Sequence, residues 1–154
     1  MLKGLWTVGL KVKNLEEEIK FHRQLGNEIV LDEEIPVERD VYRVVLVRMG
    51  DKYLHLAEKT VYEKFLGNPL PYGMVHLVYI SDDFDRDIQM FEGAGATHII
   101  PPLDVSAGFG ERRVAFLLTP NGWVCEVAKI YRHAVPEVVV MSGVVDGSQK
   151  PSPT

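Results

Sequence analysis

The 154-residue chain is 46% hydrophobic and 25% charged, which is typical of one globular domain or of two small modules that share a core. Its net charge of -5 argues against nucleic acid as a partner, because neutralising phosphates requires a surplus of Lys and Arg, and no apolar run approaches the ~20 residues of a membrane helix. The single cysteine, Cys125, excludes an internal disulfide, so a cytoplasmic location is expected.

The first part of the chain has the pattern of a strand, a helix and three further strands. Residues 5–12 form a β-type run, and Asn14 then suits the N-cap of a helix, because its side chain can accept a free backbone N–H. The helix is expected to end at Gly26 and to bury one apolar side, made of Leu15, Ile19, Phe21 with His22, and Leu25. Three β-rich runs follow, at 27–34, 41–49 and 52–58.

The same pattern returns after "TVYEKFLGNPLPYG", residues 60–73. A strand is predicted at 74–80, an N-cap at Asp83 and a helix stop at Gly95. The apolar side of this helix is expected to contain Phe84, Ile88, Phe91 and Ala94. Strands are predicted at 97–100, 112–119 and 123–130, and "PPLDVSAGFGERRVAF" (101–116) is interpreted as a long loop that leads into a strand.

The two patterns superpose at a constant offset of 69 residues, which places Asn14 on Asp83, Ile19 on Ile88 and Gly26 on Gly95. We therefore predict an α+β fold in which two tandem β-α-β-β-β modules form a cup-shaped, curved mixed sheet with the helices outside. The predicted division is a first module at 1–59, a linker at 60–73, a second module at 74–131, and a C-terminal extension with a flexible tail at 132–154.

Chemically useful side chains stand at equivalent places in the two repeats. His55 and Glu126 occupy the last strand of each repeat, and Thr7 and His76 occupy the first. Two neutral imidazoles and a carboxylate are suitable donors for a divalent transition metal. Glu126 also has apolar neighbours in sequence, and a metal would remove the cost of burying its carboxylate.

Each of these residues alone has a simpler interpretation. A buried histidine is usually a satisfied core residue, and a glutamate in a strand usually faces solvent. The repeat-related placement of His55, His76 and Glu126 favours the metal interpretation over those two.

The chain resembles the vicinal oxygen chelate superfamily, also called the glyoxalase, bleomycin resistance and dioxygenase group. The resemblance covers residues 5–131 and lies in "VGLKVKNLEEEIKFHRQLG", "VHLVYISDDFDRDIQMFEGAGA" and "RVAFLLTPNGWVCEVA". In this family, paired modules form a cup around one divalent metal ion, whose ligands come from the first and last strands of each module. By position this implicates Thr7, His55, His76 and Glu126.

The resemblance implies a metal held by His55, His76 and Glu126, with Zn, Ni, Co, Mn and Fe all open as its identity. Thr7 departs from the family pattern, which usually has His or Gln there, so a water molecule is expected near Thr7. His55 stands where glyoxalase I and methylmalonyl-CoA epimerase have Glu or Gln.

The resemblance leaves three functions open. The first is a glyoxalase-like isomerase or lyase, in which the metal stabilises an enolate-like anion of a small oxygenated substrate and Glu126 transfers the proton. The second is an Fe(II) extradiol-type dioxygenase, which matches a set of two His and one Glu. The third is a non-catalytic, resistance-type protein that binds a drug or metabolite.

Substrate contacts are expected from the segment 101–116, which in the resemblance covers the mouth of the cup. Arg112 or Arg113 could pair with a carboxylate, a phosphate or a thioester-linked group. Successive strand residues point in opposite directions, so at most one of these two arginines faces inward. Phe109 is a further candidate for the lining, together with Trp6 and Trp123, for which core packing is the simpler interpretation.

The chain ends in two segments that lie outside the duplicated pattern. "HAVPEVVVM" (133–141) could add an edge strand or reach a second subunit, and the final "SGVVDGSQKPSPT" reads as a loose tail. Members of the family are commonly homodimers, so a homodimer that acts on a small molecule is expected. His22, on the first helix, is predicted to lie at the surface or at an interface.

Overall fold

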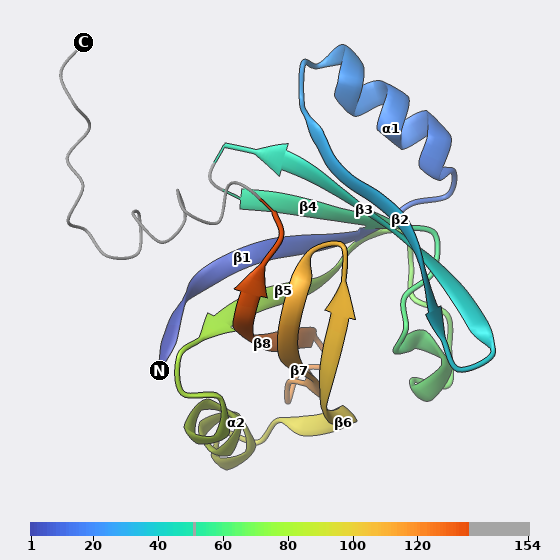
Figure 1. Ribbon diagram of the computed structural model, residues 1–154. Coiled ribbons are helices and arrows are strands. Elements are labelled where there is room, and N and C mark those ends of the chain that lie inside the picture. Colours follow the sequence, from blue (N-terminus) through green and yellow to red (C-terminus); the bar gives the residue numbers. More distant parts are fainter. Residues whose placement is uncertain (51, 136–154) are drawn as a thin grey trace, which may run out of the picture.

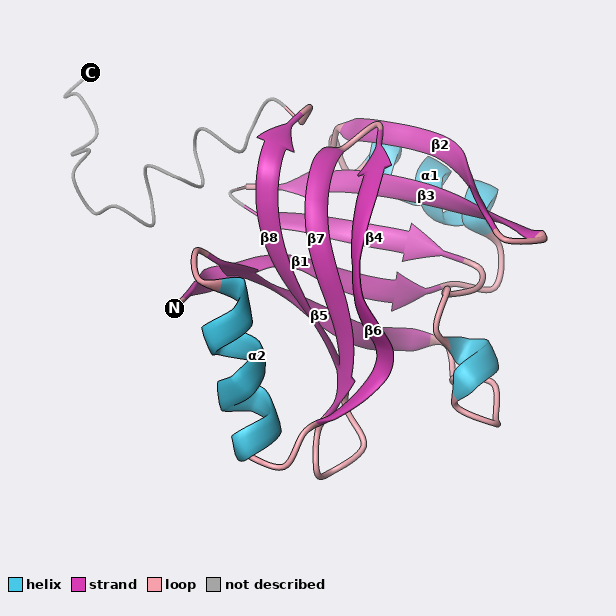
Figure 2. Cartoon of the chain, turned by 60° about the horizontal axis from the view of Figure 1, so that its bottom comes forward, coloured by secondary structure: helices cyan, strands magenta, loops and turns pink. Residues whose placement is uncertain are grey.

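A computed structural model describes residues 1–50 and 52–135 of the chain. These residues form an α+β fold, in which one strongly curved, mixed sheet of eight strands carries a helix on the outer side of each half (Figure 1). Turned by 60°, the sheet curls so that β6, β7 and β8 stand across the strands of the first half (Figure 2). The predicted cup-shaped mixed sheet is confirmed.

The elements follow the predicted order, with small shifts at their ends except in β6, which is longer than predicted. The first half contains β1 (Leu2–Lys11), α1 (Leu15–Gln24), β2 (Ile29–Val37), β3 (Asp40–Met49) and β4 (Lys52–Ala57). A short 3-10 helix, η1 (Glu63–Phe65), lies between the halves. The second half contains β5 (Gly73–Ser81), α2 (Phe84–Gly93), β6 (Thr97–Ala107), β7 (Gly110–Leu118) and β8 (Val124–His133).

The strand order β2-β3-β4-β1-β5-β8-β7-β6 is symmetrical about the junction of β1 and β5. Each half contains one parallel pair, β1 with β4 and β5 with β8, and the two halves meet through the antiparallel pair of β1 and β5. The sheet therefore brings the first and last strands of both repeats to its centre, which is where the predicted site residues stand.

Local signals at the helix ends explain where the helices start and stop. The Asn14 side chain accepts a hydrogen bond from the backbone N–H of Glu17 at 3.0 Å, as expected for an N-cap. Gly26 and Gly95 follow the two helices with φ of 81° and 95°, a left-handed conformation that other residues rarely adopt.

Helix α1 packs on the convex side of the sheet through the stripe Leu15, Ile19 and His22. His22 is only 5% exposed and lies 3.1 Å from the Asn27 side chain, so the prediction of a surface or interface His22 is wrong. The reason is helical phase, because residues 15, 19 and 22 share one face at spacings of four and three. Phe21 and Leu25, which were expected on the buried side, are 50% and 59% exposed.

The interpretation of residues 101–116 as a long loop is also wrong. β6 continues to Ala107, a turn at Gly108 and Phe109 follows, and β7 begins at Gly110. Pro101 and Pro102 are compatible with β6 because it is the last strand of the sheet, where one side of the backbone needs no hydrogen bond. The pairing of β6 with β7 shifts register between Ile100 and Leu103, at these two prolines.

In the part of the chain that the structure describes, no helix is long and apolar enough to cross a membrane. The predicted extension at 132–154 and the apolar segment at 133–141 lie outside the described residues from residue 136 onward. Up to Val135 the chain follows β8 and then packs against the main core cluster.

Candidate functional site

Strand register brings the predicted site residues together at the centre of the sheet. Gly9 on β1 is paired with His55 on β4 and with His76 on β5, so the two histidines flank a glycine. In the neighbouring row, Thr7 is paired with Val78 on β5, and Val78 with Glu126 on β8. The four positions therefore form two adjacent rows across four strands.

The side chains of these residues form one buried cluster. His76 Nε2 lies 3.9 Å from Glu126 Oε2, which is too long for a hydrogen bond, and the rings of His55 and His76 have centroids 5.7 Å apart. Thr7, His76 and Glu126 are buried, and His55 is half-buried. Thr7, His55 and Glu126 all line the mostly apolar cavity described below.

Three polar atoms of the cluster lack hydrogen-bond partners among the described residues: Thr7 Oγ1, His55 Nε2 and His76 Nε2. Leaving buried polar atoms unpaired costs about 1–3 kcal/mol each. An ion or a substrate atom between these side chains would remove that cost, so the unpaired nitrogens indicate a site that is built for a ligand.

A divalent metal fits the donor set. Bonds of ~2.0–2.2 Å to one ion place two donor atoms ~3–4 Å apart, which agrees with the separation of His76 Nε2 and Glu126 Oε2. Within residues 1–50 and 52–135, however, no three His, Cys, Asp or Glu side chains already surround a common metal position. Ligation of one ion by all three side chains would therefore require a side-chain movement.

Burial sets the charge state of the cluster. The pKa of His55 is lowered to about 4 and that of His76 to about 3, mainly by burial. The Arg112 guanidinium contributes to both values, and the His55 imidazole contributes to that of His76. Both imidazoles are therefore neutral at pH 7, which is the form that binds a metal. Burial raises the pKa of Glu126, and Arg112 partly opposes that rise.

Gly9 provides the space that the His76 ring occupies. A Cβ atom at this position would lie 2.2 Å from Cε1 and 2.4 Å from Nδ1 of His76. Real Cβ atoms do not approach other atoms so closely, so any larger residue at position 9 must displace the imidazole. An isolated glycine within a strand can signal such a close approach, and Gly9 is the one residue of the site that this rule could have found.

Gly9→Ala is expected to weaken metal binding at least tenfold and to lower the free energy of unfolding by about 1–3 kcal/mol, because the methyl group pushes His76 out of its slot. Metal titration and urea unfolding would measure the two effects. Gly93→Ala is the matched control, since a Cβ there meets no atom within 4 Å. Equal metal affinity in Gly9→Ala and wild type would contradict the inference that the space at Gly9 holds the His76 ring in place for metal binding.

Tyr62, in the segment between the halves, holds the other side of the His76 ring. Its hydroxyl lies 2.7 Å from His76 Nδ1, and both residues are buried. When Nδ1 donates its hydrogen to the phenol oxygen, Nε2 keeps the lone pair that metal ligation needs. Burial raises the pKa of Tyr62, so the phenol stays protonated at pH 7. No periodic pattern marks Tyr62 in the sequence.

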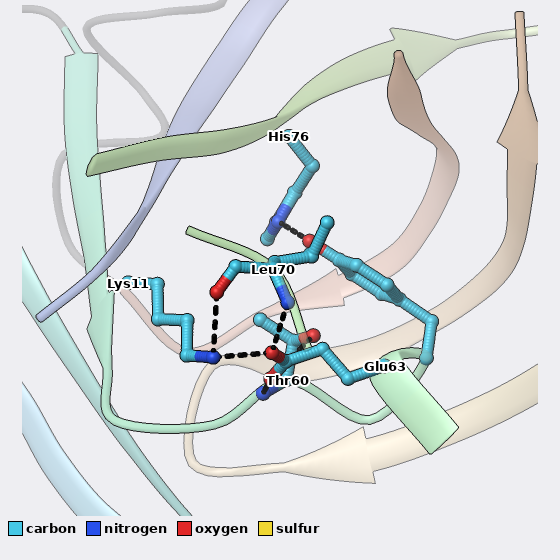
Figure 3. Close-up of polar contacts among 6 residues, drawn as sticks. Lys11, Thr60, Glu63, Leu70 and His76 are labelled. Carbon is cyan, nitrogen blue, oxygen red and sulfur yellow. Dashed lines mark hydrogen bonds and ion pairs between the residues drawn. The ribbon is translucent and has the colours of Figure 1, made fainter. Parts of the chain in front are cut away.

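A network around Glu63 fixes the segment that carries Tyr62. The Glu63 carboxylate accepts hydrogen bonds from the backbone N–H groups of Thr60 and Leu70, both at 2.9 Å, and forms an ion pair with Lys11. Lys11 also donates to the carbonyl oxygen of Leu70 at 2.9 Å. Figure 3 shows the contacts that join Lys11, Glu63 and Leu70 to one another, with His76 nearby. The segment is thereby tied to the end of β1.

Tyr62→Phe is expected to weaken metal binding about 10–100-fold, the usual effect of removing a hydrogen-bond partner from a metal-binding histidine. The loss of one buried hydrogen bond should also lower the free energy of unfolding by about 1–3 kcal/mol. The same metal titration measures the first effect. Tyr72→Phe is a suitable control, because Tyr72 is exposed. Unchanged affinity in Tyr62→Phe would show that Nδ1 needs no partner.

Of the two candidate arginines, only Arg112 faces the cup. Its guanidinium carbon lies 3.5 Å from the centroid of the Phe109 ring and 4.7 Å from that of Trp6, and its Nε is buried without a hydrogen-bond partner among the described residues. Arg113 points to the outer side, where it pairs with Asp104 at 3.2 Å.

The cup encloses a cavity of about 240 Å³ between the two halves of the sheet. Its polar part consists of Thr7, His55, Arg112 and Glu126, with Glu38 and Lys64 also on its lining. Most of its walls are apolar, with Ile35, Val37 and Leu46 from the first half and Ile100, Leu103 and Val105 from the second. Trp6 and Phe109 line the cavity, whereas Trp123 does not and is 54% exposed.

No family model matches the chain, and no curated protein matches it in sequence. Among solved structures, a variant of methylmalonyl-CoA epimerase from Streptomyces coelicolor in complex with 2-nitronate-propionyl-CoA is similar with a TM-score of 0.66 and 21% identity, over 86% of this chain and 100% of that one. Methylmalonyl-CoA epimerase from Mycobacterium tuberculosis gives a TM-score of 0.61 and 21% identity, over 90% and 93%.

A variant of 4-hydroxymandelate synthase from Streptomyces coelicolor is also similar, with a TM-score of 0.58 and 15% identity. The likeness covers 97% of this chain and 55% of that one. Identities this low establish a common fold, and the chemistry of this chain must be argued from its own residues.

Proposed function

Because the chain has the vicinal oxygen chelate fold, we propose that it is a metal-dependent enzyme of the isomerase or lyase type, glyoxalase-like in acting on a small oxygenated substrate. The observation that carries the proposal is the cluster of His55, His76 and Glu126, in which His76 Nε2 lies 3.9 Å from Glu126 Oε2. The Nε2 atoms of both histidines lack a hydrogen-bond partner among the described residues. These three residues would hold the ion.

The bound metal would supply positive charge that stabilises an anion developing on the substrate. Glu126 is the residue that would take a proton from the substrate and return it, because burial raises its pKa towards the range useful for proton transfer at neutral pH. Arg112 would hold an anionic group, and the apolar walls would exclude water, which strengthens both interactions.

The cup supports a mechanism with one base. Among the described residues that line the main cavity, the carboxylates are Glu126 on the floor and Glu38, which pairs with Lys64 at 2.7 Å. The β3 residues that line the cavity, Tyr42, Val44 and Leu46, carry no carboxylate. A single carboxylate that removes and returns the proton suits an isomerase of the glyoxalase type better than a two-base epimerase.

The apolar cavity also favours a second candidate function, a non-catalytic protein that binds a drug or metabolite. Thr7 supports this candidate, because its hydroxyl is a weak ligand for a transition metal. The Fe(II) dioxygenase remains a prediction from the ligand types alone.

Metal analysis tests the proposal. Wild type purified without chelator should contain about one divalent ion per chain, and His76→Ala should lose it, because one of three ligands is gone. The loaded enzyme would then be assayed with the methylglyoxal–glutathione adduct, with methylmalonyl-CoA and with catechols. Full metal occupancy in His76→Ala would contradict the proposed ligand set. A wild type that neither binds metal nor turns over any of these compounds would favour the alternative function, a non-catalytic binding protein.

The cytoplasmic location and the homodimer stay predictions. The same holds for the division of the chain into modules at 1–59 and 74–131 with a linker at 60–73. Sedimentation velocity on the full chain would measure the oligomeric state directly.

A further inference from the structure

Arg112 carries a positive charge for which the cup offers no direct partner. A guanidinium has five N–H donors, yet among the described residues Arg112 forms no ion pair, and its Nε is buried and unpaired. Glu126 attracts it electrostatically without a hydrogen bond. By contrast, Arg43 donates to both oxygens of Asp32 at 2.8 Å. An inward-facing arginine without an acceptor indicates that the acceptor arrives with the ligand.

Two aromatic rings hold the guanidinium in place. Phe109 and Trp6, at 3.5 and 4.7 Å from the guanidinium carbon, are 6% and 2% exposed and pack in the main core cluster. Aromatic faces stabilise the cation but accept few of its hydrogen bonds. The contacts therefore position Arg112 and leave its donors free for a planar anion such as a carboxylate, which binds a guanidinium through two parallel hydrogen bonds.

The cavity walls near the Arg112 guanidinium determine the chemistry of the rest of the ligand, beyond its anionic group. They are formed mainly by aliphatic and aromatic side chains from β2, β3, β6 and β7, so a polar body would lose its water without gaining hydrogen bonds. A cavity of about 240 Å³ is small compared with the ~300–1,000 Å³ of typical ligand pockets. The ligand body should therefore be compact and hydrophobic.

The surroundings of the cup disfavour a polyphosphate tail. Lys64 lines the cavity and also a shallow pocket beside it, which Lys11 and Lys59 line as well. Each of these lysines already has a carboxylate partner: Lys11 pairs with Glu63, Lys59 with Asp40 and Lys64 with Glu38. A nucleotide thioester, which would bring several phosphate charges to this side, finds no free lysine here, and the net charge of the chain is -5.

We propose that the cup takes a free hydrophobic monocarboxylate, with its carboxylate on Arg112 and its apolar body between the walls of the two halves. This assignment rests on the proposed function for the placement of the reacting carbon near His55, His76 and Glu126. Binding of the acid itself requires only Arg112 and the walls, so it can be tested without metal.

The test is calorimetric titration of the full chain, in EDTA, with 4-phenylbutanoate, its neutral analogue 4-phenylbutanamide, the dianion succinate and 4-phenylbutanoyl-CoA. Wild type should bind the acid at least tenfold more tightly than the amide, succinate or the thioester. Arg112→Met keeps the length and the apolar stem and should abolish the preference for the acid over the amide. Arg113→Met, one residue away on the outer side, should keep it within about twofold.

An amide or thioester that binds as tightly as the acid would overturn the assignment, and so would an Arg112→Met protein that keeps the preference. The comparison of acid with amide on wild type decides the question even if Arg112→Met fails to fold. If wild type prefers the acid over the amide in EDTA but never binds metal, the carboxylate site is supported and the proposed metal-dependent enzyme is contradicted. If wild type binds metal but shows no preference for the acid, the carboxylate site is contradicted and the proposed metal site is supported.

Discussion

Glu126→Gln is expected to lower turnover by about 10²–10⁴-fold, the usual contribution of a general base, while the protein still folds. Glutamine keeps an oxygen near His76 Nε2 but cannot accept the substrate proton at neutral pH. The expected signature is therefore a large loss in kcat with a smaller change in metal content. Steady-state kinetics and metal analysis on the same preparation would separate the two effects.

The same substitution should stabilise the metal-free protein. Burial raises the pKa of Glu126 above that of the unfolded chain, so its contribution to stability is present at low pH and is lost as pH rises through the folded-state pKa. At pH 7, which lies above the pKa of the unfolded carboxyl group, the burial of Glu126 therefore opposes folding, and the neutral amide removes this cost. Glu111→Gln is the control, because Glu111 is exposed and pairs with Arg132 at 3.2 Å. A kcat within threefold of wild type in Glu126→Gln would exclude it as the base.

Acidification of the metal-free protein from pH 7 to pH 4 is expected to lower the free energy of unfolding by roughly 3–6 kcal/mol through His55 and His76. Burial lowers their pKa values from 6.5 to about 4 and about 3. Between pH 6.5 and these values the unfolded chain takes up protons that the folded chain does not, so stability is fully present above pH 6.5 and falls with pH. Protonation of Glu126 opposes this loss over part of the range.

Urea unfolding at pH 7, 5.5 and 4 would measure the effect in EDTA. His76→Gln should show a flatter dependence on pH than wild type, because a group that must stay neutral in the fold has been replaced by one that cannot ionise. His98→Gln is the control, since His98 lies on β6 beside Glu92 at 2.8 Å, away from the cup. Identical pH slopes for wild type and His76→Gln would show that His76 is not held neutral by burial.

The repeated pattern made the fold predictable from the sequence. Asn14, Gly26 and Gly95 are local signals for helix ends. Because such signals recur at a constant offset, the assignment of elements in one repeat supported the assignment in the other. A signal that depends on a few neighbouring residues can be recognised in the sequence without knowledge of the tertiary structure. Where one repeat lacked such a signal, as in the proline-containing β6, the prediction was wrong, because only the edge position of the strand makes Pro101 and Pro102 acceptable there.

The sequence by itself determined the curved α+β sheet and the candidates Thr7, His55, His76 and Glu126, because duplication places equivalent residues at equivalent strand positions. The tertiary structure alone decided how these side chains are supported. Gly9 makes room for His76, and Tyr62 contacts Nδ1 of its ring. Arg112 packs against two aromatic rings, and its Nε has no acceptor among the described residues. Such features depend on strand register and on what distant segments leave unpaired, and no spacing along the chain encodes them.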